Sequence, residues 1–208
     1  MQTSPADGFL FESSGKQTLQ VELLPYEQMG TVFPNGMLHF EQRYEEGFLQ
    51  ADDGTRIHAF KPLPESANVR LLTADQGAVV ATFPSLRDGL KHLNINLNDV
   101  VPGSNCHGLV FACASFWIGD DQVEFILAGD SYEMVPLVAA QIAIYRLAGA
   151  VVHSARVVPP WGDFVSKAGV RGMNISRSLL EAARGIAHDS CTFYAKKAVR
   201  TAPMPAKP

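Results

Sequence analysis

The sequence predicts an α+β protein, in which a β-rich N-terminal region, residues 1–94, precedes a region of mixed strands and helices, residues 95–200. Two observations support this prediction. In the first region, turn signals separate short apolar runs, and Asp53-Gly54 is the strongest of these signals. From Asn105 onward, apolar residues recur at helical spacing, and the later apolar runs are short like strands. Residues 201–208 contain proline and small residues and are expected to form a disordered tail.

Composition and charge narrow the class of protein. The chain has 208 residues, of which 47% are hydrophobic and 18% charged, so it can bury a sizeable core as one large domain or two small ones. The net charge is −4 and the basic residues are scattered, which argues against nucleic-acid binding. No apolar run is long enough to span a membrane. Residues 1–8 do not read as a secretory signal, so we expect a cytoplasmic protein or one exported by a dedicated secretion system.

The elements of the N-terminal region follow from its apolar runs and turns. The charged residues 41–46 are expected to form a solvated turn or a helical turn. The remaining expected elements are strands at 9–11 and 18–24, a hairpin of 48–52 and 55–60, and a second hairpin of 69–73 and 78–83.

The C-terminal region alternates helical and strand patterns. Asn105 begins a helix that extends through Trp117, and Asp120 or Asp121 caps the next helix, residues 120–127. The other expected elements are a helix at 85–93, strands at 142–146, 150–158, 163–167 and 191–195, a glycine-rich loop at 168–172, and a helix at 176–187 with Ser176 as its cap.

Cys106 is the strongest candidate for a chemically active residue. It follows the N-cap Asn105, so it lies in the first helical turn, where the helix dipole favours the thiolate over the thiol. The thiolate is the nucleophilic form of cysteine. Five apolar positions at helical spacing would bury the helix behind it: Leu109, Val110, Cys113, Phe116 and Trp117. The alternative is a buried cysteine that acts only as a small hydrophobe.

The three cysteines do not form a disulfide or metal pattern. Cys106 and Cys113 would lie two helical turns apart, too far to bridge, and Cys191 is left without an obvious partner. Neither Cys-x-x-Cys nor His-x-x-x-His spacing occurs among the candidate ligands. We therefore expect reduced cysteines, no metal and no cofactor.

An activated cysteine needs a base, and His153 is the best candidate. It lies in the strand predicted at residues 150–158 and shares a face with Val151, Ala155 and Val157. A helix that starts with cysteine and packs on this strand would form a thiolate–imidazolium pair, which lowers the pKa of the cysteine. The alternative is a histidine satisfied in the protein interior.

Three segments carry a resemblance to a known family: Asn-Cys-His-Gly-Leu-Val from Asn105, Gln-Ile-Ala-Ile-Tyr-Arg from Gln141, and Val-Val-His-Ser-Ala-Arg-Val-Val from Val151. Together they resemble the NlpC/P60 group of papain-like cysteine peptidases, over roughly residues 95–195. The resemblance implies a papain-like domain in which the nucleophile helix packs on an antiparallel sheet, with Cys106 as nucleophile and His153 as base.

The chain departs from the family pattern around these two residues. Asn105 stands where the family has aspartate, which keeps the cap, and His107 stands where it has serine. The family's third polar residue has no clear equivalent; Ser166, Asp163 and Lys167 are the candidates. We favour Ser166 because Asp163 only opens the strand.

The resemblance implies a hydrolase that cleaves an amide bond in a peptide-type substrate, often a peptidoglycan stem peptide. The Cys106 backbone N–H and a neighbouring donor such as His107 would hold the oxyanion. His107, Trp161 and Arg171 are the candidate substrate-binding residues. Two alternatives stay open: a papain-like deamidase, thioesterase or acyltransferase acting on proteins, and a non-catalytic binding module.

Overall fold

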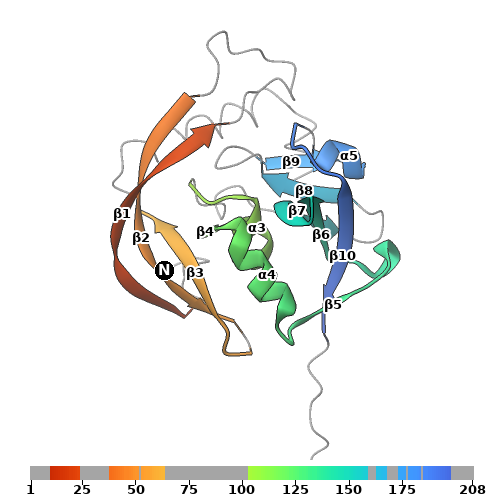
Figure 1. Cartoon of the computed structure of the whole chain (residues 1–208), viewed down its shortest axis with the longest axis horizontal. Coiled ribbons are helices and arrows are strands. Elements are labelled where there is room, and N and C mark those ends of the chain that lie inside the picture. Colours follow the sequence, from red (N-terminus) through yellow and green to blue (C-terminus); the bar gives the residue numbers. More distant parts are fainter. Residues whose placement is uncertain are drawn as a thin grey trace, which may run out of the picture.

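The chain folds as an α+β structure with two antiparallel sheets and few helices. This computed structural model describes residues 10–23, 38–51, 53–63, 103–158, 163–167, 173–176, 178–183 and 185–197. Figure 1 shows the four-stranded sheet on the left, the six-stranded sheet on the right, and two helices between them. The α+β class predicted from the sequence is confirmed.

The four-stranded sheet has the order β1 (Phe11–Leu23), β2 (Leu38–Gln50), β3 (Arg56–Pro62) and β4 (Trp117–Ile118). The hairpin predicted around Asp53-Gly54 joins β2 to β3, with Gln50 paired to Arg56. Gly54 has a φ of 84°, a conformation that glycine adopts without steric cost, and the Asp53 carboxylate accepts a hydrogen bond from the Thr55 N–H at 2.9 Å.

Two predictions for this sheet are wrong. Residues 41–46 do not form a turn, because they continue β2, in which Tyr44 is fully buried while Arg43 is exposed. This alternation is that of a half-buried strand. The predicted break between residues 9–11 and 18–24 is also absent, because β1 runs through it and absorbs the extra residue as a register shift between Ser13 and Gly15.

The six-stranded sheet contains the strands predicted in the C-terminal region. Its strands, in sheet order, are β5 (Tyr132–Met134), β10 (Ser190–Lys196), β6 (Ile142–Leu147), β7 (Ala150–Val158), β8 (Asp163–Lys167) and β9 (Met173–Ser176). All of the pairings are antiparallel. The last described strand, β10, lies between β5 and β6, so it is paired with a neighbouring strand on each side.

Of the two helices between the sheets, one is shorter than the apolar pattern predicted and the other matches its predicted bounds to within one residue. The first, α3 (Cys106–Phe111), ends early, and the positive φ angles of Cys113 (47°) and Ala114 (59°) turn the chain into β4. Cys113 is exposed and does not pack behind the nucleophile. The second, α4 (Asp120–Ala128), has Gly119 as its N-cap, so the predicted aspartate cap is wrong; Asp120 and Asp121 lie in its first turn instead.

Two further short helices follow α4 in the chain. These are the 3-10 helix η4 (Leu137–Ala139) and α5 (Leu179–Ala182). The helix predicted from Ser176 is correspondingly wrong at its start, because Ser176 ends β9 and only four residues are α-helical. Several predictions lie outside the described residues: the second hairpin, the helix at 85–93, the glycine-rich loop and the tail.

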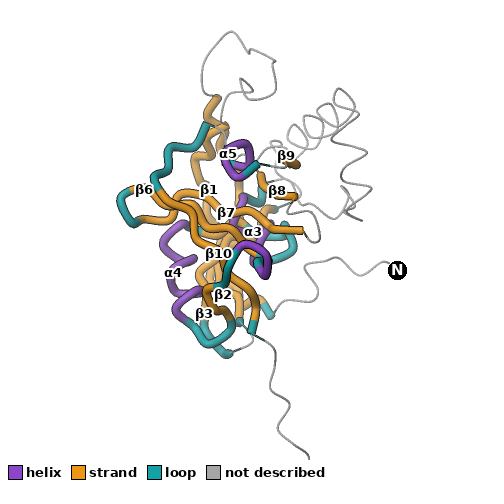
Figure 2. The backbone as a smooth tube through the Cα atoms, turned by 90° about the vertical axis from the view of Figure 1, so that its right-hand side faces the viewer, coloured by secondary structure: helices purple, strands orange, loops and turns teal. Residues whose placement is uncertain are grey.

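Three apolar clusters hold the layers together. Leu49 and Ile57 of the four-stranded sheet pack on Phe116 and Ile126, and Val123 of α4 packs on the other sheet. A third cluster, around Tyr145 and Phe164, lies between the six-stranded sheet and α5. Figure 2, seen from the side of the six-stranded sheet, shows that sheet nearer to the viewer than α3 and α4. Among the described residues, no helix has the length and apolar character that crossing a membrane requires.

Gly108 should tolerate no side chain. A Cβ at this position would lie 1.7 Å from the Phe116 carbonyl oxygen, which is backbone and cannot move aside without disturbing β4. We therefore expect Gly108→Ala to destabilise the fold by at least about 2 kcal/mol, in the range typical of overpacked sites. Urea unfolding measures the change. Gly15→Ala is the control, because a Cβ there meets nothing within 4 Å. Equal stabilities of the two variants would contradict this account of α3.

Candidate functional site

The start of α3 is fixed by the side chain of Asn105. Its Oδ1 accepts hydrogen bonds from the backbone N–H groups of Gly108 (2.9 Å) and Ile118 (3.1 Å). Its Nδ2 donates to the Ile118 carbonyl at 2.6 Å. The predicted N-cap is therefore confirmed, and the same residue also ties the helix start to β4. The position of Cys106, the next residue, depends on this tie.

Cys106 is the first residue of α3 and is only 7% exposed. Burial alone would raise the pKa of the Cys106 thiol. The positive charges of His107 and His153, together with hydrogen bonds from both imidazoles, outweigh burial and bring the pKa of Cys106 well below its ordinary value. The two imidazoles therefore favour the thiolate form of the buried sulfur.

His153 reaches the sulfur from β7, on which it is fully enclosed and paired with Tyr145 of β6. Its Nε2 lies 3.1 Å from the main-chain carbonyl oxygen of Ala182 in α5. A carbonyl oxygen can only accept, so Nε2 carries the hydrogen. This tautomer leaves Nδ1 as the ring nitrogen available to the sulfur, with the ring held from behind by α5.

The group that orients His153 is thus a main-chain carbonyl, which the search for a third polar side chain missed. Ser166, the predicted third residue, donates its hydroxyl to the same Ala182 oxygen at 2.9 Å. The serine and the histidine are brought together through that oxygen. No sequence signal could have identified it, because every residue has a carbonyl and only the position of α5 selects this one.

His107 is a second imidazole at the sulfur. It is fully buried, with Nδ1 2.9 Å from Ser154 Oγ and Nε2 2.8 Å from Asp120 Oδ1. Burial lowers the pKa of His107, but the Cys106 thiolate and the hydrogen bond that His107 donates to Asp120 outweigh burial and raise the pKa to about 10. His107 is therefore an imidazolium at neutral pH. Substrate binding by His107 stays a prediction.

Asp120 and Ser154 were not identified as site residues from the sequence. Asp120 was assigned only as a helix cap, and in the structure it lies in the first turn of α4 with its carboxylate turned to His107. The adjacent positions Ser154 and His153 of β7 contact His107 and Cys106 respectively. A serine after the histidine is too common for its spacing to have been a signal.

Lys167 of β8 is fully buried, and α3 packs on β7 and β8. Its Nζ donates to Ser104 Oγ at 3.0 Å, two residues before the nucleophile. Asp163, the other residue considered for the third position, begins β8 opposite Val158. Trp161 and Arg171 lie outside the described residues. Among the described residues, no three His, Cys, Asp or Glu side chains are arranged to hold a metal ion.

Comparisons of the chain with protein-family models, with curated proteins and with solved structures gave no match. What this site can do chemically is therefore inferred from its geometry. The site combines a cysteine whose thiolate is favoured, an imidazole that contacts the sulfur and is oriented by a carbonyl, and a second imidazole beside the sulfur. This combination suits attack on an electrophilic carbon followed by proton transfer to a leaving group.

Cys106 should react with iodoacetamide at pH 6. An ordinary cysteine is under about 1% thiolate at that pH, whereas the lowered pKa of Cys106 favours its thiolate. We expect Cys106 to alkylate about tenfold or more faster than Cys191, the pKa of which burial raises to about 11. Peptide mass spectrometry measures the rate at each site.

His107→Asn tests the physical cause of this reactivity. Loss of the imidazolium should move the midpoint of the pH–alkylation profile of Cys106 to higher pH. Cys113 is exposed and reports general reagent accessibility in the same digest. An unchanged midpoint in the variant, or equal rates at all three cysteines in the wild type, would contradict the thiolate assignment.

Proposed function

We propose that the protein is a papain-like cysteine hydrolase that cleaves an amide bond in a peptide-type substrate, with Cys106 as nucleophile and His153 as general acid and base. The observation that carries the proposal is the pair of contacts of His153, with the Cys106 sulfur on one side and the Ala182 carbonyl on the other. A nucleophile, a base and an orienting group in that order are the parts that covalent catalysis requires.

The acylation step uses the thiolate directly. A sulfur lone pair attacks the carbonyl carbon of the substrate, the C–S bond forms, and the π electrons move to the oxygen as an oxyanion. When the oxyanion collapses, the C–N bond breaks, and the imidazolium of His153 gives its proton to the leaving amine. We expect the Cys106 backbone N–H to donate to the oxyanion.

The deacylation step regenerates the site. His153, now neutral, takes a proton from water while the oxygen attacks the thioester carbon, and the C–S bond breaks to release the acid and the thiolate. His107, whose ring nitrogens contact Ser154 and Asp120 and which also hydrogen-bonds the Cys106 sulfur, is assigned no proton transfer in this cycle. Its charge favours the thiolate before the attack and after product release, when the thiolate in turn raises the pKa of His107.

The substrate class follows from the resemblance to the NlpC/P60 group, which favours a peptidoglycan stem peptide. Deamidation or acyl transfer on a protein would proceed through the same acyl-enzyme and would differ only in what is bound and what attacks the thioester. The first test is therefore made on wall fragments, and the readout is a specific broken bond.

Wild-type protein should cleave one amide bond type in purified muropeptides, and Cys106→Ala should abolish the cleavage. His153→Ala should reduce the rate by about 10³-fold or more, as expected when a nucleophile loses its general base. Mass spectrometry of timed digests identifies the new termini. Cys113→Ala is the matched control, since this cysteine is exposed and lies outside the site.

Two outcomes would contradict the proposal. One is cleavage that persists in Cys106→Ala, which would assign it to a contaminant or another site. The other is a wild-type protein that leaves every muropeptide bond intact and forms no thioester at Cys106 with peptide or protein acyl donors.

A further inference from the structure

Lys167 is a buried cation for which the mechanism above has no use. Its side chain is fully buried in β8, and its Nζ is held by the hydroxyl of Ser104 at 3.0 Å. Among the described residues, no carboxylate lies within ion-pair distance of it. A buried ammonium with a neutral hydroxyl as partner is costly to keep, since burial disfavours charge unless an opposite charge compensates it.

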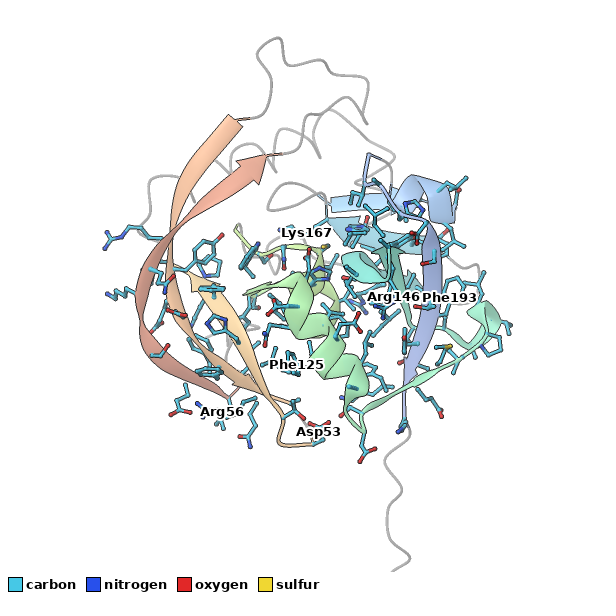
Figure 3. The ribbon with its side chains drawn as sticks, in the orientation of Figure 1. Asp53, Arg56, Phe125, Arg146, Lys167 and Phe193 are labelled. Atoms are coloured by element: carbon cyan, nitrogen blue, oxygen red, sulfur yellow. The ribbon has the colours of Figure 1, made fainter. Side chains whose placement is uncertain are left out.

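The opposite charge near Lys167 is the nucleophile itself. Burial lowers the pKa of Lys167 to about 7, and the one charged group that raises its pKa is the Cys106 thiolate. Ser104 and Cys106 are two residues apart, and Figure 3 shows Lys167 where β8 meets the start of α3. The ammonium is thus held in the electrostatic field of the sulfur, at the side of the loop that leads into the helix.

The charge on the sulfur does not stay there during attack. As the C–S bond forms, the negative charge leaves the sulfur and appears on the carbonyl oxygen of the substrate, one bond further on. A cation that is close to the sulfur before the C–S bond forms is therefore expected to be close to the oxyanion once that bond has formed. Preorganised donors of this kind, which need not reorient as charge develops, stabilise the transition state strongly.

We propose that Lys167, tethered by Ser104, is a catalytic residue of the oxyanion site, where its ammonium donates to the oxyanion formed at Cys106. This inference rests on the proposed function and adds a residue to it. His107, the donor first expected beside the Cys106 N–H, is engaged by Ser154 and Asp120. The described partner of Lys167 is the neutral hydroxyl of Ser104. An ammonium has three N–H donors, so Lys167 can donate to an oxyanion as well as to this hydroxyl.

The test compares two reactions of the same sulfur at pH 6. Iodoacetamide alkylates the thiolate by direct displacement of iodide, and no oxyanion forms. p-Nitrophenyl acetate acylates the thiolate through a tetrahedral oxyanion, and the phenolate leaves without needing a proton from His153. Both reactions require the thiolate, so the ratio of the acylation rate to the alkylation rate reports the oxyanion site alone.

Lys167→Met should lower this ratio by about 10²-fold, the usual effect of losing an oxyanion donor. Methionine fills the buried space without a charge, so the variant should fold at least as stably as the wild type. Lys167→Arg should restore most of the ratio. Ser104→Ala keeps the ammonium but removes its tether, so a smaller loss, about tenfold, is expected. Intact mass of the Cys106 adducts and phenolate release give the two rates.

Each remaining outcome overturns a distinct claim. An unchanged ratio in Lys167→Met would remove the lysine from the oxyanion site and leave the proposed function intact. Equal loss of both rates would show that Lys167 acts on the thiolate or on the fold, and the proposal would fail. Wild-type protein that is alkylated at Cys106 but never acylated there would overturn the proposed function, and the role of Lys167 with it.

Discussion

The hydrogen bonds of the Asn105 side chain are the constraint on which the site depends. One carboxamide satisfies the Gly108 N–H of the helix and both backbone groups of Ile118, so α3 and β4 are fixed to each other. Phe116, the residue that approaches Gly108 most closely, is fully buried. Because β4 pairs with β3 while α3 packs on β7 and β8, this small junction also joins the two sheets. The nucleophile is the residue next to that junction.

Burial normally suppresses the ionisation of a thiol. Around Cys106, burial also strengthens the attraction between the sulfur and the cations next to it. Exclusion of water opposes the thiolate, and it also strengthens the attraction of each nearby cation. His107 and His153 each lower the pKa of Cys106, and the Cys106 charge in turn raises the pKa of Lys167. The charged form of each group is favoured by its neighbours, so loss of one charge weakens the others.

The sequence predicted the parts of the site that local patterns determine. The cap at Asn105, the strands that carry His153 and Lys167, and the Asp53-Gly54 hairpin all follow from short-range chemistry. It failed where a contact between distant segments decides. The apolar run after Phe111 has helical spacing and therefore predicts a helix, yet Trp117 and Ile118 pair with β3 as a strand. Residues 41–46 are mostly charged and therefore predict an exposed turn, although Tyr44 among them is fully buried.

The two histidines of the site illustrate why position alone does not assign a catalytic role. His107 is adjacent to Cys106 and hydrogen-bonds its sulfur, and its ring nitrogens also contact Asp120 and Ser154. His153 comes from a separate strand, and its Nε2 faces the Ala182 carbonyl. A main-chain carbonyl neither takes up nor gives up a proton. That leaves the other nitrogen free to exchange a proton. In the proposed mechanism, the base loses its charge when it protonates the leaving amine, and the sulfur must be ionised before the attack that precedes this step. His107, the second imidazole, favours the ionised sulfur, and the thiolate in turn raises the pKa of His107, so the two rings have different roles in the proposed mechanism.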